Sequence, residues 1–186
     1  MSGRLPPPKQ LKLFQFVGQQ QPNREPESST PEPATTESPN LETPLGTSGS
    51  GNQSMMIHAW DGYARYAWGA NEIRPVSKSA HSGSVFGGGR LGASIVDGMD
   101  TLYIMGLMNR FDNGKKWIEL SFDMKNWRGD LSVFETNIRF IGGLLSCYAL
   151  TKHEIFKKRA NEVAELLLPA FNTPTGIPHA LVHTQT

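Results

Sequence analysis

One carboxylate and one guanidinium stand four residues apart in an otherwise apolar stretch of the sequence. They belong to Glu135 and Arg139. Residues at positions i and i+4 share one face of an α-helix. The apolar stripe predicted around them consists of Phe134, Ile138, Ile141, Leu144, Leu145 and Tyr148. Beside such a stripe, the two charged groups either satisfy each other as an ion pair or form one side of a polar site.

Both residues also have ordinary structural explanations. Ser132-x-x-Glu135 matches a capping box, in which the serine caps the helix and the glutamate reaches back to the serine N–H. Arg139 would then neutralise Glu135. Gly142 and Gly143 argue against a purely local role, because each glycine in a helix interior costs about 1 kcal/mol relative to alanine. The pair therefore needs a packing reason, such as close approach by a neighbouring helix or a ligand.

The first 54 residues differ in composition from the rest of the 186-residue chain. Residues 18–54 are rich in Gln, Pro, Glu, Ser, Thr and Gly. Such a segment buries too little apolar surface to offset the entropy lost when its backbone is ordered. We therefore predict a disordered tether over residues 1–54 and a folded domain over residues 55–186.

The charge pattern argues against nucleic acid and membrane-spanning functions. The formal net charge is +1, with acids and bases interspersed, so we predict no basic face for nucleic acid. No stretch is apolar enough to span a bilayer. Lys12 and Gln15 interrupt the few apolar residues near the N-terminus, so no clear targeting signal is predicted. We interpret Lys157-Lys158-Arg159 as the solvated face of a helix.

The thiol and imidazole side chains show no catalytic pattern. Cys147 is the single cysteine, and its place in an apolar helix predicts a small buried hydrophobe rather than a reactive thiol. The histidines lack the spacing of a zinc site, so none is assigned to a metal. They are His58, His81, His153, His179 and His183.

Apolar periodicity predicts a series of helices joined by loops, without strand alternation. The predicted helices span about residues 54–72, 94–109, 112–122, 132–150 and 154–168. This pattern indicates an all-α fold in which helical hairpins lie side by side.

Two further segments have plain interpretations. Residues 77–92 are rich in glycine but lack the Gly-Lys-Ser/Thr ending of a phosphate-binding loop, which favours a flexible surface loop presenting His81 and Ser82. Asp97 and Asp100 are assigned to the positive end of the dipole of the second helix. Alternatively, the two acids could contact a metal or a sugar, but no third ligand lies near them in the sequence.

Six motifs follow one another along the predicted domain. They are Trp60-Asp61-x-Tyr63, Tyr66-Ala67-Trp68-Gly69-x-Asn71-Glu72, Ile95-Val96-Asp97-x-x-Asp100-Thr101-Leu102, Ser132-Val133-Phe134-Glu135-x-Asn137-Ile138-Arg139, Gly142-Gly143-Leu144-Leu145-Ser146 and Leu168-Pro169-Ala170-Phe171-Asn172-Thr173-Pro174. In order and approximate spacing they resemble the N-terminal part of the class I α-mannosidases, glycoside hydrolase family 47. The resemblance covers about residues 55–181. It is strongest to the Golgi-type enzymes, although mannosidase-like proteins of endoplasmic-reticulum degradation share the Phe134-Glu135 motif.

The resemblance implies a fold, a reaction and roles for two residues. The fold would be part of an (α/α)7 barrel of helical hairpins. The reaction would be calcium-dependent, inverting hydrolysis of terminal α-1,2-linked mannose on high-mannose N-glycans of glycoproteins. By resemblance, Glu135 is the acid catalyst and Arg139 contacts the bound mannose. The calcium-binding threonine region has no counterpart in the chain, so no metal ligand is assigned here. The family also implies the Golgi and endoplasmic reticulum membrane system as the location.

The later hairpins of the family, with its other catalytic carboxylates, have no counterpart before Thr186. We therefore expect a truncated catalytic domain that is inactive alone and exposes apolar faces. The alternatives are a non-catalytic module that binds a glycan or a partner protein, or a chain that has no function and is degraded.

Overall fold

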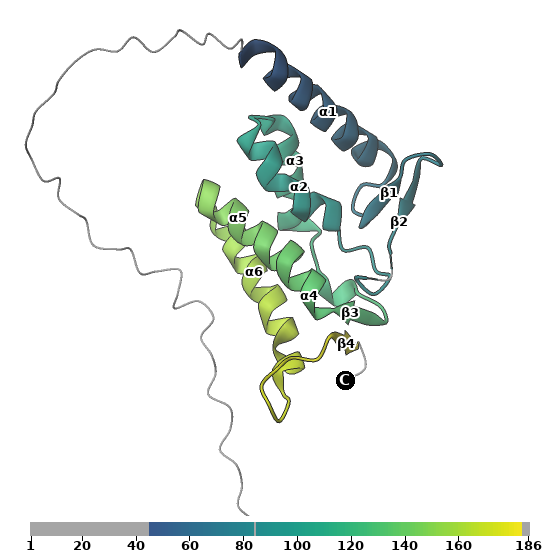
Figure 1. The fold of residues 1–186 in the computed structure, drawn as a ribbon, viewed down its shortest axis with the longest axis vertical. Helices are drawn as coiled ribbons and strands as arrows, with labels where there is room; N and C mark the ends of the chain where they lie inside the picture. The colour runs from purple at the N-terminus through teal and green to yellow at the C-terminus, as the bar shows by residue number, and fades with distance from the viewer. Residues whose placement is uncertain (1–44, 84, 184–186) are drawn as a thin grey trace, which may run out of the picture. The chain divides into compact units, whose positions relative to one another are not determined.

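The computed structural model describes residues 45–83 and 85–183 (Figure 1). The helices are α1 (Leu45–Tyr66), α2 (Ala93–Ile104), α3 (Met108–Leu120), α4 (Val133–Thr136), α5 (Gly142–Thr151) and α6 (Glu154–Leu167). Two 3-10 segments, η1 (Met124–Asn126) and η3 (Leu168–Phe171), and one π-helical segment, η2 (Asn137–Ile141), interrupt or extend them. The strands are β1 (Glu72–Arg74), β2 (Ser79–His81), β3 (Asp130–Ser132) and β4 (Leu181–His183).

The helices pack as neighbouring hairpins. α2 packs against α3, α5 packs against α6, and α2 also contacts α5, which joins the two hairpins (Figure 1). This arrangement confirms the predicted all-α fold class. The described helices do not by themselves close a barrel. None of them is long and apolar enough to cross a bilayer.

The short strands were not predicted. β1 pairs antiparallel with β2, and β3 pairs antiparallel with β4. Each strand has three residues, which is too short for a two-residue alternation to stand out in the sequence. The first hairpin occupies part of the segment predicted to be a flexible loop. There His81 lies in β2, and its Nδ1 is 3.2 Å from the Glu72 carboxylate.

Several predicted helix boundaries are wrong. α1 begins at Leu45, so residues 45–54, assigned to the tether, are helical; the remainder of that prediction, residues 1–44, lies outside the described residues. α1 ends at Tyr66 rather than near residue 72, because the chain then turns through Gly69 into β1. Gly106 has a φ of 70° and ends the second helix early, as glycine does just after a helix terminus.

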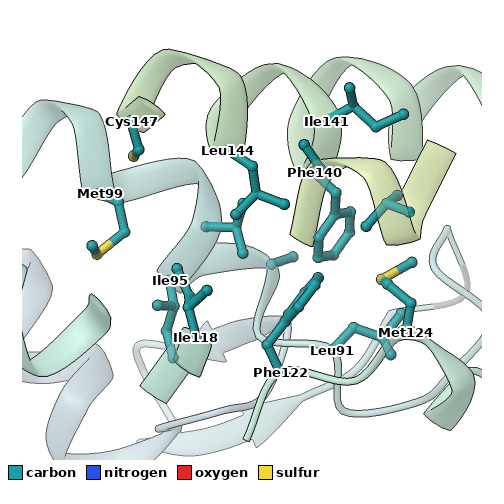
Figure 2. Close-up of a cluster of buried hydrophobic side chains, with 14 of the residues drawn as sticks. Leu91, Ile95, Met99, Ile118, Phe122, Met124, Phe140, Ile141, Leu144 and Cys147 are labelled. Atoms are coloured by element: carbon teal, nitrogen blue, oxygen red, sulfur yellow. The ribbon is translucent and has the colours of Figure 1, made fainter. Parts of the chain in front are cut away.

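A single apolar cluster holds the hairpins together. Its side chains come from α1, α2, α3, η2, α5 and α6 and from the segments between them, and Figure 2 shows part of it. The members labelled in the figure are Leu91, Ile95, Met99, Ile118, Phe122, Met124, Phe140, Ile141, Leu144 and Cys147. Phe140 packs edge to face against Phe86, with ring centroids 5.1 Å apart. The loop that contains Phe86 is therefore anchored in the core.

The predicted helix over residues 132–150 is present, but it changes geometry in the middle. α4, η2 and α5 follow one another without a break, and η2 is a π-helix. The predicted apolar stripe is wrong in part: Ile141 and Leu144 are buried, whereas Phe134 is 66% exposed and Ile138 is 47% exposed. The buried face is made by Val133, Thr136, Phe140, Ile141, Leu144 and Cys147. The two exposed side chains agree with the expectation of uncovered apolar surface.

The basic cluster at the start of α6 is only partly a solvated face. Lys157 and Lys158 are exposed as predicted. Arg159 instead donates from Nε to the Ile118 carbonyl and from Nη2 to the Glu119 carbonyl. These carbonyls belong to the last turn of α3, which lacks partners for such groups within the helix. Arg159 therefore ties α6 to the end of α3.

Of the two adjacent glycines, Gly142 and Gly143, only Gly143 shows the close approach that the sequence predicted. A Cβ atom on Gly143 would lie 2.9 Å from the Val96 carbonyl oxygen and 3.3 Å from Val96 Cγ1. This confirms that a neighbouring helix, α2, approaches closely. A Cβ on Gly142 would meet no atom nearer than the Asn137 carbonyl oxygen at 3.8 Å, so Gly142 is exposed and has no such reason.

We predict opposite effects for alanine at these neighbouring positions. Gly143→Ala forces α2 and α5 apart and should lower the free energy of unfolding by about 1–3 kcal/mol, as overpacking does. Gly142→Ala fills open space and removes backbone freedom from the unfolded chain, so it should be neutral or stabilise by up to about 1 kcal/mol. Urea unfolding followed by circular dichroism measures both. Equal destabilisation by the two variants would contradict the close approach at Gly143.

A second prediction concerns Cys147, which is buried as the sequence indicated. Burial, with a smaller contribution from the charge of Asp100, raises the pKa of its thiol to about 12. Above about pH 9 the unfolded chain therefore loses the thiol proton while the folded chain keeps it. The free energy of unfolding should fall as the pH rises, by up to about 1.4 kcal/mol per pH unit for this group.

Comparison of the wild type with Cys147→Ala isolates the effect of the thiol. The alanine variant has no thiol to ionise, so its stability should fall less steeply above pH 9. Tyr63, whose pKa is also raised by burial, is present in both proteins and cancels. Stability curves that stay parallel between pH 8 and pH 11, measured with a reductant present, would contradict this prediction.

Candidate active site

Glu135 stands at the start of the helix, in a half-formed capping box. The Ser132 hydroxyl accepts a hydrogen bond from the Glu135 backbone N–H at 3.3 Å. The reciprocal bond is absent, because the Ser132 N–H donates to the Val85 carbonyl at 3.1 Å instead. The Glu135 carboxylate is therefore not used in the cap. It accepts from Arg139, and its second oxygen, Oε1, has no partner among the described residues.

Arg139 binds two carboxylates at once. Its Nε donates to Glu135 Oε2 at 2.6 Å, and its Nη1 donates to Asp97 Oδ2 at 2.9 Å. Glu135, followed by Asp97, raises the pKa of Arg139, so the guanidinium stays charged. The pair predicted from the i, i+4 spacing is present, but it is one half of a three-residue cluster that spans two helices. We call Asp97, Glu135 and Arg139 the charged cluster.

The charged cluster lines a hollow of about 180 Å³. The other lining residues come from the start of β1 and the residue before it, from the loop before α2 and from the first turn of α2. They are Asn71, Glu72, Val85, Phe86, Ala93 and Ser94. The hollow thus carries three carboxylates and one guanidinium beside an aromatic ring. Such a mixture suits a ligand with many hydroxyl groups, because each hydroxyl can both donate and accept.

Asn71 lines the hollow and joins three segments around it. Its buried amide donates to the Gly89 carbonyl at 2.8 Å and accepts from the Leu91 N–H at 2.9 Å. Its own carbonyl accepts from the N–H and the hydroxyl of Ser94. One side chain and its backbone thereby tie β1, the glycine-rich loop and α2 together. The sequence showed Asn71 only as part of a family motif.

The dipole interpretation of Asp97 and Asp100 is wrong. α2 begins at Ala93, and its first turn holds no acid. The stabilising effect of an acid falls off within that first turn. Both carboxylates instead bind side chains of the neighbouring helix: Asp97 binds Arg139, and Asp100 accepts from the Ser146 hydroxyl at 2.8 Å. Sequence spacing could not find these partners, since they lie more than 40 residues away.

The residues that the structure describes do not fit a metal ion. They contain no group of three or more His, Cys, Asp or Glu side chains placed to hold one. The carboxylates of Asp97 and Glu135 are engaged by a guanidinium, whose positive charge disfavours a cation between them. That this part of the chain contributes no calcium ligand stays a prediction.

A larger hollow, of about 480 Å³, is lined by residues of α1 and α3 and by Trp68. In this hollow Arg110 donates two hydrogen bonds, of 2.8 and 2.7 Å, to the two carboxylate oxygens of Asp61, so both oxygens are already used. Neither Glu135 nor Arg139 reaches it. We place the candidate site in the smaller hollow, because carboxylates with unused oxygens face that one.

Comparisons with known proteins agree with the fold. The sequence model of glycosyl hydrolase family 47 matches residues 55–186. Over 134 residues, 72% of this chain, the chain is 58% identical to mannosyl-oligosaccharide alpha-1,2-mannosidase IA of Drosophila melanogaster. It is 54% identical to human mannosyl-oligosaccharide 1,2-alpha-mannosidase IB over 134 residues. These matches cover 20% and 21% of the relatives' own lengths.

A solved structure shows the same likeness. An alpha-1,2-mannosidase from Trichoderma reesei matches 73% of this chain and 30% of its own, with a TM-score of 0.67 and 27% sequence identity. The chain therefore belongs to glycosyl hydrolase family 47, and its helical hairpins form part of the (α/α)7 barrel of that family. It spans about a fifth of the length of the curated relatives it matches.

We predict that Glu135→Gln changes the stability of the chain by less than about 1 kcal/mol. The Glu135 and Arg139 side chains are 28% and 45% exposed, and ion pairs at such positions contribute little to folding. The neutral amide also keeps the volume of the carboxylate. Thermal unfolding in low and high salt checks this. A loss of several kcal/mol would show that the pair is kept for folding rather than for a ligand.

Proposed function

We propose that this chain carries the Glu135 side of the active site of an α-1,2-mannosidase that trims high-mannose N-glycans. Family membership and the names of the relatives support a glycoside hydrolase. The observation that carries the proposal is the orientation of Glu135. Its carboxylate lines the hollow beside Arg139 and leaves the Ser132 amide to another partner.

In this proposal, Glu135 protonates the glycosidic oxygen as the bond to mannose breaks, directly or through a water molecule. Arg139 holds hydroxyls of the same sugar. Inversion also requires a second carboxylate that activates water on the opposite face of the ring, about 6.5–9.5 Å from the first. Asp97 does not suit that role, since it is bound to the same guanidinium as Glu135. We therefore expect residues 1–186 alone to release no mannose.

The cellular setting of the proposal follows the family. Its substrates are high-mannose glycans on glycoproteins, and its location is the Golgi and endoplasmic reticulum membrane system. Calcium would bind outside the described residues, which hold no suitable ligand group. Golgi-type processing is favoured over endoplasmic-reticulum degradation, because the two quoted relatives at 54–58% identity are named mannosyl-oligosaccharide α-1,2-mannosidases.

A second candidate function is glycan binding without hydrolysis. The observation behind it is that Arg139 and the free oxygen of Glu135 offer hydrogen bonds to a sugar, while Asp97, the nearest other carboxylate, is held by Arg139. Substitution of Glu135 distinguishes the two functions. Hydrolysis depends on the Glu135 proton and is lost in Glu135→Gln, whereas binding alone depends on Arg139 and survives that change.

A chimaera tests the proposed role of Glu135. Residues 55–186 replace the matching segment of the Drosophila mannosidase, whose 58% identity makes the core compatible. We expect the chimaera to release mannose from a high-mannose oligosaccharide in the presence of calcium. Glu135→Gln should lower the rate by about 10²–10⁴-fold, the usual contribution of a general acid. Liquid chromatography of the released sugar measures the rate.

The matched control is Glu154→Gln, the same chemical change on an exposed residue of α6, which should leave the rate unaltered. An active chimaera that is indifferent to Glu135→Gln would overturn the assignment of the acid. Mannose release by residues 1–186 alone would overturn the expectation that the chain is inactive without further hairpins.

A further inference from the structure

α2 and the helix that carries Glu135 meet along one line of contacts. Gly143 lies against the Val96 carbonyl, the Ser146 hydroxyl donates to Asp100, and Arg139 donates to Asp97. Residues 139, 143 and 146 follow one another on one face of their helix, and residues 96, 97 and 100 face them. The bond between Asp97 and Arg139 is the contact of this series that lies at the hollow.

The hydrogen bonds of Arg139 can be counted. A guanidinium has five N–H donors in a fixed plane. Glu135 uses the Nε–H and Asp97 uses one hydrogen of Nη1. Three N–H groups, one on Nη1 and two on Nη2, have no partner among the described residues. With two bonds from different helices, the plane of the guanidinium is fixed and the remaining donors keep one direction.

We propose that Asp97 is the positioning residue that holds the Arg139 guanidinium so that its three remaining N–H groups face a sugar bound in the hollow. The identity of that sugar as a mannoside rests on the proposed function. Without Asp97, Arg139 keeps one anchor, Glu135, on its own helix and is free to rotate about the bonds beyond Nε. The sugar would then have to order the side chain on binding, which costs affinity.

A purely structural role explains Asp97 less well. Its side chain is 40% exposed and that of Arg139 is 45% exposed, so the pair contributes little to folding. Asp100, one turn along the same helix, already joins α2 to α5 through Ser146. Asp97 differs from Asp100 in that it lines the hollow and binds the one cation among the lining residues.

Nitrogen-15 NMR of the arginine side chains tests the proposal directly on the 186-residue chain. Rotation of the guanidinium group slows when Glu135 holds its Nε and Asp97 holds its Nη1. The Nη1 and Nη2 signals of Arg139 should therefore be separate in the wild type at low temperature. In Asp97→Ala these signals should merge, while the Nε signal, held by Glu135, should persist. Alanine is the best helix former, so α2 should keep its structure.

Asp100→Ala is the matched control, because it removes a carboxylate from the same helix without touching Arg139. It should leave the Arg139 signals separate. Arg110, which Asp61 holds with two bonds, serves as an internal reference for folding in every variant. Separate Nη signals in Asp97→Ala, or their loss in Asp100→Ala to the same degree, would overturn the proposal.

If Asp97→Ala does not fold, Glu135→Gln gives the complementary result. In that variant the Nε signal of Arg139 should change its chemical shift, while the Nη1 signal should stay separate from the Nη2 signal because Asp97 still holds it. Merging of the Nη1 and Nη2 signals in Glu135→Gln would likewise overturn the role of Asp97. Titration with α-1,2-linked mannobiose tests the sugar separately. We expect it to shift the Arg139 Nη signals, with at least tenfold weaker binding in Asp97→Ala than in Asp100→Ala. No binding by the wild type would count against the proposed function, whereas the guanidinium spectra alone decide whether Asp97 holds Arg139.

Discussion

The close approach of α2 and α5 at Gly143 is the constraint on which the rest of the structure depends. Because Gly143 has no side chain, the Val96 carbonyl can lie where a Cβ would stand. At that separation, short side chains reach across: the Ser146 hydroxyl bonds to Asp100, and Asp97 meets Arg139. A larger residue at position 143 would widen the gap and break these polar contacts together. The backbone geometry in the core therefore sets the geometry of the charged cluster.

The hollow is assembled from segments that are distant in sequence but rigidly connected. Asn71 fixes the loop between β2 and α2 and the start of α2, and Phe86 on that loop packs against Phe140 in the core. The Val85 carbonyl takes the Ser132 N–H, which leaves the Glu135 carboxylate free of the cap. Each contact that builds the hollow is thus also a contact of the folded core. A site of this kind is better ordered than one carried on mobile loops.

The sequence predicted much of this fold because most of the signals are local. The amphipathic pattern placed α6 within one residue of its observed end, and Pro169 marked that end. It also predicted the burial of Cys147 and a tight contact at Gly143. The pair of Glu135 and Arg139 followed from i, i+4 spacing. These features depend on neighbours within one or two helical turns, which a single sequence contains.

The features that were missed depend on distant neighbours or on small changes in geometry. The partner of Asp97 is 42 residues away, so a local rule assigned Asp97 to the helix dipole. Three-residue strands leave no readable alternation. The π-helical segment η2 has no sequence signature, and the exposure of Phe134 and Ile138 depends on which face of the helix the neighbouring helices cover. Here tertiary packing, rather than local preference, decided the outcome.

The π-helical segment also affects how this helix can change during evolution. A π-helical turn closes its hydrogen bonds over one residue more than an α-helical turn, so the loss of one residue within Asn137–Ile141 can be absorbed by a return to α-helical geometry. The same loss in the first turn of α5 has no such relief: an α-helix turns by about 100° per residue, so Leu144 would leave the apolar cluster or Glu135 would swing away from the hollow. Single-residue deletions should consequently be tolerated better in η2 than in α5, and best in connections such as that between β1 and β2.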